Sequence, residues 1–502
     1  MNYSKLTSLL FFVFISIGAA FSQEVYEVEI LPPTKEGIME NINGEIIKRL
    51  VGTVKLRHKK NLIDCDSAII YQNNNIDAFG HVVIRKNSQT KVQGEVLHYF
   101  SNQKLAVLSQ NVILTDKKSK LYTEDITYDL FNDIGYYMTG GKLVNDGSEI
   151  TSQQGTFYTK INQVLFKQNV KLNHPKYNLT SDSLQYDTKL KRSIFKTSTK
   201  IENDSGYIWC NSGWHDEEKN QSSFGQGTYI YDAPQWILTD SIFYDRKNGK
   251  SYIYKTFEFH DTAMKVHMFG DSAYMFNDNK DMIAYKRPIL IIESSDNKPT
   301  FIRGDILETK TDKKNNKVLN AIKNVRMYSR DFQGVGDTMN YFSADSMLIM
   351  RKNAVLWKDE YQILGDKIIT YFENKKPKLM HIFGNSFVAS QETIKGHFNQ
   401  ISSDTNYVQF KDGSLDNMFA FGNAKSIYYG KEDAPKMGYL GLNSTESYSL
   451  RMIYDSSKPK KIVFYEKPKA IFYPVKEITD ANRFLSNFVW KEALKPKSKD
   501  DL

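Results

Sequence analysis

One short alternation of polar and apolar residues recurs along the chain. Asp182-Ser183-Leu184-Gln185-Tyr186 reads acid, small polar, apolar, any residue, tyrosine. Successive side chains of a β-strand point to opposite faces, so the second and fourth residues after the acid share one face. The alternation predicts a strand that is apolar on one side. Four further segments keep the acid, the apolar residue and the tyrosine: Glu95–Tyr99, Glu124–Tyr128, Asp240–Tyr244 and Asp337–Tyr341.

The acids of this alternation recur at a nearly fixed interval. They stand at positions 66, 95, 124, 182, 240, 271, 305, 337 and 366, with a weaker copy at Gln154. The steps are roughly 28 to 34 residues, with two steps between 182 and 240, and such a period is typical of a repeat architecture. We expect the acid to serve a turn or the start of its strand, with its side chain accepting hydrogen bonds from backbone N–H groups.

A second segment in each repeat follows the acid by about 14 to 19 residues and contains Gly or Asn at its middle. These two residue types tolerate positive φ, so a strand that contains one can bend sharply and continue. The pattern predicts bent strands. The segments are Ala78–Val82, Leu108–Val112, Phe166–Val170, Ile322–Val325, Arg351–Ala354, Phe383–Ser386 and Phe421–Ala424.

No repeat can bury its apolar face alone, so stacked repeats are expected to face each other as two sheets. The predicted fold is all-β, a slit-like β-jellyroll of stacked, bent antiparallel strands. Ser183 and Ser241 are expected on the solvent face. The inward positions are Ala68, Ile70, Leu97, Tyr99, Ile126, Tyr128, Leu184, Tyr186, Ile242, Tyr244, Met339 and Tyr341.

The array is predicted to occupy residues 23–475. Pro288 and the polar run Asp312–Asn316 interrupt the pattern, which indicates a bulge, a long loop or a junction of two arrays near residues 285–320. Residues 476–502 are predicted to form a short helix and a charged tail, as a cap over the last sheet edge or as a docking element. The helix would begin at Thr479 and Asp480 and end near Pro496, with Phe484, Leu485, Phe488 and Val489 in one stripe.

Residues 1–22 have the pattern of a secretory signal peptide. Lys5 precedes a mostly apolar run, and Ala20-Phe21-Ser22 offers a small-x-small cleavage site. The alternative, an uncleaved membrane anchor, is disfavoured because the run is short for a bilayer span. No cysteine follows the run, so a lipoprotein anchor is not supported. We therefore expect an exported protein.

Charge and cysteine content add two expectations. The formal net charge is +9, with acids interspersed among the lysines. This balance is typical of a solvated surface and also suits an anionic partner, although export argues against nucleic acid. Cys65 and Cys210 are the two cysteines. Five repeats would separate them by about 24 Å at 4.8 Å per strand, beyond disulfide reach, so two free thiols are predicted.

The sequence offers little catalytic chemistry. It has no His-Glu-x-x-His motif, no Cys/His cluster, no Gly-x-Ser-x-Gly elbow and no phosphate-binding glycine loop. We predict no metal site, no cofactor and no enzyme activity. A glycosidase with paired carboxylates stays open, because stacked repeats could bring two acids within about 5 to 9 Å. The repeat explains the acids more simply.

The alternation of Asp182–Asp187 with Gln168-Asn169-Val170-Lys171-Leu172, in an exported all-β chain, resembles the OstA/LptA family, and more narrowly the long OstA-like proteins of Bacteroidota. The resemblance covers residues 45–430 and is clearest over 60–190 and 330–425. It implies a periplasmic lipopolysaccharide transport protein, possessing no catalytic site, that binds acyl chains between two sheets. The inward positions from Ile70 to Tyr341 given above would then line the lipid groove.

The resemblance also implies partners. The protein would pass lipopolysaccharide from an inner-membrane extractor to an outer-membrane translocon, and would pair with them, or with copies of itself, through open strand edges. The location would be the periplasm, with association to the outer membrane as a further option. The chain departs from the family in its greater length and in lacking a C-terminal barrel. The main alternative is an exported β-repeat protein that binds or degrades polysaccharide.

Overall fold

The computed structural model describes residues 28–58, 60–85, 90–116, 119–145, 147–276, 281–293, 298–314, 316–374, 376–431, 438–455 and 458–502. The predicted signal segment, residues 1–22, lies outside this range. Within it, regular structure consists of antiparallel β-strands and five 3-10 turns. The all-β fold class is therefore confirmed.

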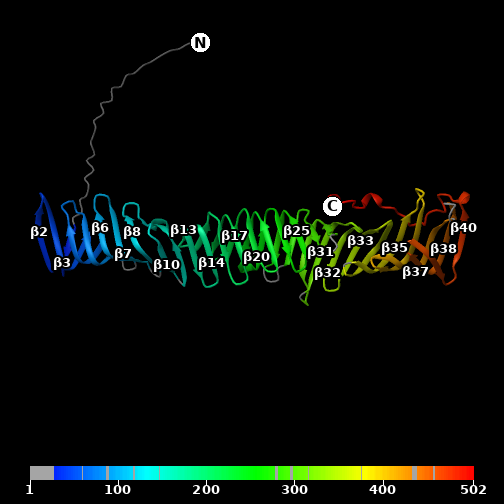
Figure 1. Cartoon of the computed structure of the whole chain (residues 1–502), viewed down its shortest axis with the longest axis horizontal. Helices are drawn as coiled ribbons and strands as arrows, with labels where there is room; N and C mark the ends of the chain where they lie inside the picture. Colours follow the sequence, from blue (N-terminus) through cyan, green and yellow to red (C-terminus); the bar gives the residue numbers. More distant parts are fainter. Residues whose placement is uncertain are drawn as a thin grey trace, which may run out of the picture. The chain divides into compact units, whose positions relative to one another are not determined.

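The chain divides into two compact units. Unit 1 comprises residues 1–149 and 154–160, and unit 2 comprises residues 150–153 and 161–502. The strands of unit 1 are β1 (Glu29–Leu31), β2 (Glu36–Ile42), β3 (Glu45–His58), β4 (Asn61–Ile70), β5 (Ile76–Arg85), β6 (Thr90–Phe100), β7 (Leu105–Asp116), β8 (Ser119–Asp129), β9 (Ile134–Tyr137), β10 (Gly141–Asn145) and β12 (Gln154–Tyr158). Figure 1 labels β2, β3, β6, β7, β8 and β10 among them.

Strand β11 (Ser148–Ser152) and turn η1 (Thr159–Ile161) contain the points at which the chain changes unit. Unit 2 then begins and ends with long strands. These are β13 (Gln163–His174), β14 (Tyr177–Asp187), β31 (Lys317–Ser329), β32 (Phe332–Phe342), β33 (Met347–Lys358), β34 (Tyr361–Glu373), β35 (Lys376–Gln391), β36 (Phe398–Lys411), β37 (Ser414–Lys431), β38 (Tyr439–Asp455), β39 (Lys458–Tyr465) and β40 (Lys469–Pro474).

Between β14 and β31 the strands of unit 2 are short, and turn η2 (Arg246–Asn248) lies among them. They are β15 (Arg192–Phe195), β16 (Thr199–Glu202), β17 (Gly206–Cys210), β18 (Gly213–Asp216), β19 (Gln221–Phe224), β20 (Thr228–Asp232), β21 (Gln235–Thr239), β22 (Ile242–Asp245), β23 (Lys250–Ile253), β24 (Phe257–Asp261), β25 (Val266–Gly270), β26 (Ser272–Phe276), β27 (Asp281–Tyr285), β28 (Ile289–Ile292), β29 (Thr300–Arg303) and β30 (Ile306–Thr311).

The long strands bend at their middle, as the Gly and Asn residues predict. In the pairing of β13 with β14 the register shifts between Lys167 and Val170, because Gln168 and Asn169 form a bulge with φ of 62° and 54°. Gly384 and Asn385 in β35 have φ of 69° and 47° at the corresponding shift. A two-residue bulge in left-handed conformation turns the strand while pairing continues on both sides.

The bends divide the strands of each unit into two sheets. We call the one that contains the predicted inward tyrosines the tyrosine sheet, and the other the facing sheet. In β14, residues 183–187 belong to the tyrosine sheet and pair with β13 and β15, whereas residues 178–181 belong to the facing sheet and pair with β16. The short strands follow the same division: β22, β23, β26, β27 and β30 lie in the tyrosine sheet, and β21, β24, β25, β28 and β29 in the facing sheet.

The region 285–320, where a junction was one of three expectations, lies inside unit 2. Pro288 stands in the break between β27 and β28, and Asp312 and Asn316 lie in the connection from β30 to β31. Strand β27 pairs with β30, and β28 with β29, so pairing continues in both sheets through this region.

The acids stand in two kinds of place. Asp240, Asp271 and Asp305 come just before β22, β26 and β30, as expected of a strand start, whereas others lie inside longer strands, where that expectation was wrong. Asp182 is the sixth residue of β14, at the bend, and Asp366 and Asp404 lie at the same place in β34 and β36. Five of the acids accept a hydrogen bond from a side chain in the bulge of the neighbouring strand. The pairs are Asp66 with His81 (2.7 Å), Asp305 with Asn324 (3.1 Å), Asp337 with Asn353 (3.3 Å), Asp366 with Asn385 (3.0 Å) and Asp404 with Asn423 (3.0 Å).

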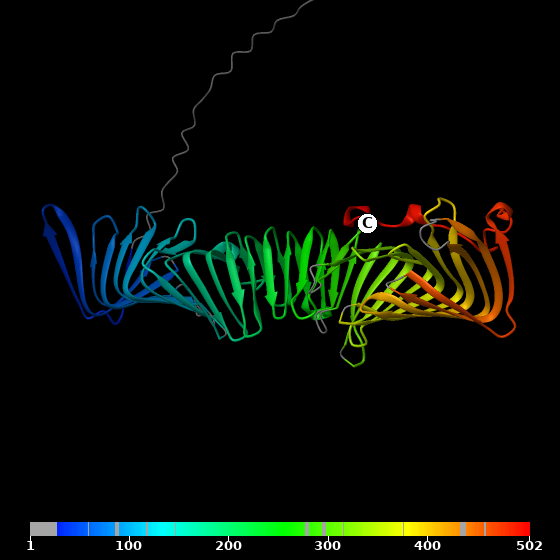
Figure 2. The same cartoon turned by 45° about the vertical axis from the view of Figure 1, so that its right-hand side comes forward.

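The predicted C-terminal helix is also wrong. Residues 475–502 contain only the 3-10 turns η3 (Val475–Glu477), η4 (Glu492–Leu494) and η5 (Lys499–Asp501). This segment, which we call the strap, runs back from β40 along earlier strands of unit 2 (Figure 2). The Phe and Leu side chains that resemble a helical stripe pack on the outer surface of the facing sheet: Phe488 lies 5.0 Å from Phe398, ring centroid to ring centroid.

Two glutamines of the facing sheet form hydrogen bonds with backbone groups of the strap, which in a helix would bond to one another. Gln400 donates to the Arg483 carbonyl (2.8 Å) and accepts from the Leu485 N–H (2.9 Å). Gln362 does the same with Val489 (2.7 Å) and Lys491 (2.6 Å). Both glutamines are buried, each four residues before its bend acid. Tertiary contacts of this kind override a marginal helical pattern, because a short helix gains little from propensity alone.

Candidate functional site

The predicted inward residues occupy the interior between the two sheets. Leu97, Leu184 and Ile242 have no measurable exposure, and Tyr99 and Tyr186 are 7% and 6% exposed. Tyr128, Tyr244 and Tyr341 are half-buried near the strand ends. The other buried members of the set are Ala68, Ile70, Ile126 and Met339. The alternation therefore identifies the interior face, while the binding of lipid there stays a prediction.

The facing sheet completes this interior with apolar side chains of its own. In unit 1 these include Leu56, Ile63, Val112 and Leu121, which are all buried. In unit 2, Leu172 and Leu179 play the same part. Within each unit, stacked strands thus produce a row of apolar side chains on both inner faces.

In unit 1 one polar contact joins the two sheets at their free ends. The hydroxyl of Tyr99, in the tyrosine sheet, lies 2.9 Å from Nδ1 of His58, in the facing sheet. The two rings are 5.2 Å apart, and both residues are buried. This contact holds the sheets together on the side opposite the bends.

Unit 2 has aromatic contacts in the corresponding place. Tyr177 of the facing sheet meets His215 of the tyrosine sheet edge to face, with centroids 6.0 Å apart. Burial raises the pKa of Tyr177 to about 12 and lowers the pKa of His215 to about 4, so both are neutral near pH 7. Further along, Tyr361 and Tyr454 meet across the sheets at 5.8 Å.

Tyr99 was among the predicted site residues, but His58, Tyr177, His215, Tyr361 and Tyr454 were not. Each stands at the end of a strand, outside the five-residue alternation. A possible signal in the sequence is an aromatic or His residue on the apolar parity at a strand end, as in His58 and Tyr177. Which residue lies opposite it depends on pairing across the interior, for which the sequence contains no local pattern.

Most of the predicted inward side chains are buried against one another, and cavities of about 640 and 400 Å³ lie at two of the bends. A ligand with acyl chains must therefore separate the sheets at their free ends, where the aromatic contacts hold them.

The structure adds little support for catalysis. Among the described residues, no group of three or more His, Cys, Asp or Glu side chains is arranged to hold a metal ion. Cys65 and Cys210 are both buried free thiols, and burial raises the pKa of each to about 12. For Cys65 the charge of Asp66 raises it further. Thiols with such pKa values are poor nucleophiles at neutral pH.

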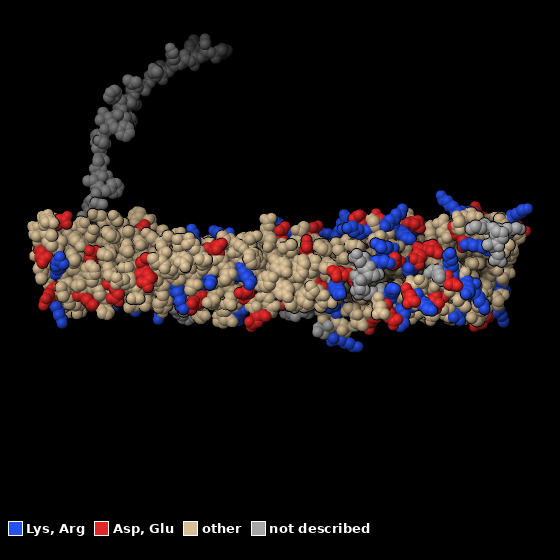
Figure 3. Space-filling model, in the orientation of Figure 1, with Lys and Arg blue, Asp and Glu red and all other residues tan. Residues whose placement is uncertain are grey.

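Charged side chains are abundant on the outside, although Asp216, Asp261, Asp281, Glu308 and Lys358 are buried. On the face shown in Figure 3, Lys and Arg gather over the C-terminal strands of unit 2, with Asp and Glu among them. The exposed Lys425 and Glu446, for example, are 2.8 Å apart. No helix in the described part of the chain has the length and apolar character to cross a bilayer.

Each unit also has open strand edges. In unit 1, β2 pairs with β3 and with no other described strand, and β1 likewise pairs only with β3. In unit 2, β39 and β40 each pair only with β38 among the described strands. Backbone N–H and C=O groups along such edges are available for another strand.

Two family models match the sequence. Residues 34–182 match the model described as OstA-like protein, and residues 265–376 match the one described as LptA/(LptD N-terminal domain) LPS transport protein. Both matches lie in the bent, stacked strands described above. A comparison with curated proteins finds no match.

Among solved structures, the chain is similar to LptH, described as the LptA homologous periplasmic component of the lipopolysaccharide transport device of Pseudomonas aeruginosa. The identity is 15%, the TM-score is 0.20, and the match covers 21% of this chain and 79% of LptH.

Proposed function

Because the chain is a protein of the OstA/LptA family, we propose that it binds lipopolysaccharide by its acyl chains between the tyrosine sheet and the facing sheet. In this proposal the protein carries or bridges the lipid through the periplasm, from the inner membrane to the outer membrane. The observation that carries the proposal is the continuous row of buried apolar residues, exemplified by Leu184 and Tyr186 in β14. The proposed function needs no catalytic group.

The energetics favour opening of the interior around an acyl chain. A methylene transferred from water to an apolar interior contributes about 0.8 kcal/mol, so ten methylenes contribute about 8 kcal/mol. One hydrogen bond such as that between Tyr99 and His58 contributes about 1 kcal/mol. Displaced side chains exchange one apolar partner for another. Breaking a cross-sheet contact therefore costs much less than the chain gains.

The sugars and phosphates of the lipid would stay in water at the free ends of the sheets, because burying unpaired polar groups costs free energy. Movement along the row would not require the acyl chains to return to water. The open edges at β2, β39 and β40 support pairing with an inner-membrane extractor, an outer-membrane translocon or a second copy of the chain.

The proposal is tested by photo-crosslinking in cells. Tyr186 and Tyr341 are replaced, one at a time, by a photoreactive phenylalanine, which preserves an aromatic ring in the interior. The control is the same group at Ser183, which neighbours Leu184 but points to the other face. We expect lipopolysaccharide adducts at the two tyrosine positions. Adducts only at Ser183 would refute the interior as the binding site.

A second measurement tests transport itself. Depletion of the protein should leave newly made lipopolysaccharide in the inner membrane, because the step between the membranes is interrupted. If the protein instead binds or degrades exported polysaccharide, lipopolysaccharide reaches the outer membrane at the normal rate and the polysaccharide changes in amount or length.

A further inference from the structure

The bend at Asp271 lacks the hydrogen bond between acid and bulge that is present at Asp305, Asp337, Asp366 and Asp404. Asp337 is followed 16 residues later by Asn353, which donates to it. Asp271 is followed after the same interval by Arg287. Lys286 and Arg287 have φ of 62° and 58°, close to the 56° and 54° of Lys352 and Asn353. An arginine therefore stands where the other bends have their pairing residue.

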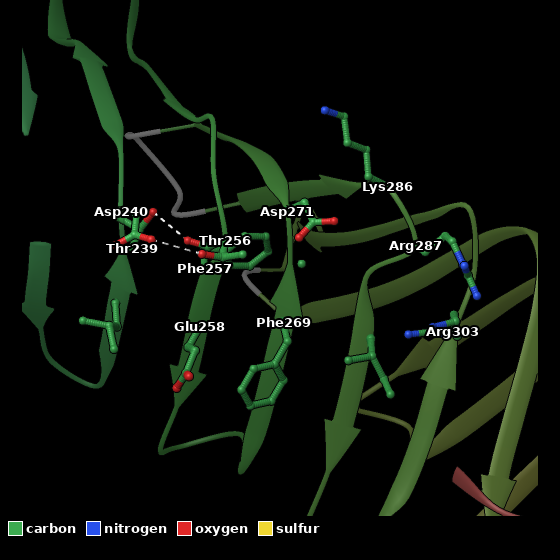
Figure 4. A pocket seen from close by; sticks show the side chains of 13 residues that line it. Thr239, Asp240, Thr256, Phe257, Glu258, Phe269, Asp271, Lys286, Arg287 and Arg303 are labelled. Atoms are coloured by element: carbon green, nitrogen blue, oxygen red, sulfur yellow. Dashed lines mark hydrogen bonds between the residues drawn. The ribbon is translucent and has the colours of Figure 1, made fainter. Parts of the chain in front are cut away.

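Arg287 does not restore the missing pair. Among the described residues, Arg287, Lys286 and Asp271 have neither a hydrogen bond nor an ion pair. All three line the cavity of about 640 Å³ at this bend. Figure 4 shows Arg287 and Lys286 on the opposite side of that cavity from Asp240 and Thr256, with Asp271 between them.

Arg303 of β29 adds a second guanidinium to the same side of the cavity. Its Nε is buried and has no hydrogen-bond partner, while its Nη1 donates to the Leu502 carbonyl oxygen of the strap at 2.6 Å. Burial, and next the charge of Arg287, lower the pKa of Arg303. Two guanidinium groups thus lie close enough to repel each other, and each retains unused donors.

The acids of the cavity offset this charge only in part. Asp240 accepts from Thr256 Oγ1 at 3.5 Å, and Glu258 lies 3.7 Å from the imidazole of His260. Asp271 remains as the one acid of the cavity without a partner among the described residues. Proteins commonly bind a tetrahedral oxyanion with neighbouring arginines whose N–H donors are unpaired, because each guanidinium can donate to two oxygens.

We propose that the cavity formed by Lys286, Arg287 and Arg303 binds a phosphoryl group. The group can belong to a phosphorylated lipid headgroup or to a free phosphate, and both offer the same oxygens to the arginines. The site lies at a bend, on the side opposite the free ends where the proposed function places the sugars and phosphates of the lipid, so it does not depend on that function. Asp271 opposes the anion and limits its affinity.

Titration of the full-length chain with inorganic phosphate at low salt, followed by calorimetry, tests the site. Arg287→Gln and Arg303→Gln should each weaken binding at least tenfold, because each removes a charged fork. Asp271→Asn should strengthen binding several-fold. The matched control is Lys352→Gln, which removes a lysine from the equivalent position of another bulge and should leave binding unchanged.

A parallel arm uses vesicles of phosphatidylcholine with and without phosphatidic acid. Binding to phosphatidic acid vesicles alone, lost in Arg287→Gln, supports a lipid headgroup as the source. Binding of inorganic phosphate, lost in the same variant, supports the phosphoryl group itself. The proposal is overturned if neither ligand binds, or if Arg287→Gln binds like the native chain. Crosslinking of lipopolysaccharide at Tyr186 should be unchanged in Arg287→Gln, which separates this site from the proposed function.

Discussion

The bend of β35 offers a quantitative test of how the acids shape the strands. Gly384 has φ of +69°, and a Cβ added there would lie 2.4 Å from Asp366 Oδ2. In Gly384→Ala the left-handed conformation costs about 1 kcal/mol. Asp366 must also move, which sacrifices the 3.0 Å hydrogen bond from Asn385, another ~1 kcal/mol. We expect Gly384→Ala to lower the free energy of unfolding of this region by about 2 to 3 kcal/mol.

Gly413→Ala is the matched control. Gly413 has φ of +86°, but its added Cβ meets only the Lys376 side chain, at 3.5 Å or more. This substitution should lower the free energy of unfolding only by the cost of the left-handed backbone conformation, about 1 kcal/mol. Asp366→Ala removes the carboxylate but leaves its own Cβ 3.1 Å from the added methyl group, so in that background most of the extra cost of Gly384→Ala over Gly413→Ala should disappear. The double-mutant cycle of Gly384→Ala and Asp366→Ala should yield a coupling free energy of about 1 to 2 kcal/mol.

Urea unfolding, combined with hydrogen exchange of residues 376–391, measures these differences locally, since stacked repeats need not unfold in one step. The reasoning is refuted if Gly384→Ala and Gly413→Ala cost the same, or if Asp366→Ala fails to relieve the penalty. Gly422, whose added Cβ would lie 2.3 Å from Asp404 Oδ2, provides an independent repetition of the experiment.

Three further predictions concern the strap, the thiols and pH. Gln400→Ala should release the strap, because it removes two hydrogen bonds worth about 2 kcal/mol together, and hydrogen exchange over residues 479–495 should become faster. Gln333→Ala is the control and should leave this exchange unchanged, because the Gln333 side chain donates to the Ser329 and Arg330 carbonyls and not to the strap. Cys65 and Cys210 should react with a thiol reagent at pH 8 only after the protein unfolds, and a disulfide between them in mass mapping would contradict this. Because burial raises the pKa of both thiols to about 12, the free energy of unfolding should fall as pH rises above the unfolded thiol pKa near 8.5. Burial lowers the pKa of His215 to about 4, below its unfolded value near 6.5. The stability that the neutral imidazole contributes is therefore present above about pH 6.5 and is lost as pH falls toward 4. His215→Gln should make the free energy of unfolding less sensitive to acid in that window, and an unchanged dependence on pH would count against a buried neutral imidazole.

Local alternation was sufficient to predict the strands and their inner face. Leu184 and Tyr186 point inward because the side-chain period of a strand is two, and this holds wherever the strand lies. The bends at Gln168-Asn169 and Gly384-Asn385 could be predicted for a similar reason, since tolerance of positive φ is a property of the residue itself. The all-β fold and the stacking of repeats follow from these two local rules.

Contacts between distant residues decided the rest. Asp366 pairs with Asn385 only because the bulge of one strand faces the bend of the next, so the position of the acid within β34 could not be predicted from its own segment. Phe484 and Phe488 have helical spacing, yet buried Gln362 and Gln400 bind the strap backbone in another conformation. The sequence by itself determined which residues are strands, where they bend and which face is apolar. Only the tertiary structure decided that His58 lies opposite Tyr99, that the strap covers the facing sheet, and that Arg287 and Arg303 line one cavity. The reason is that each of these contacts joins residues far apart in the chain.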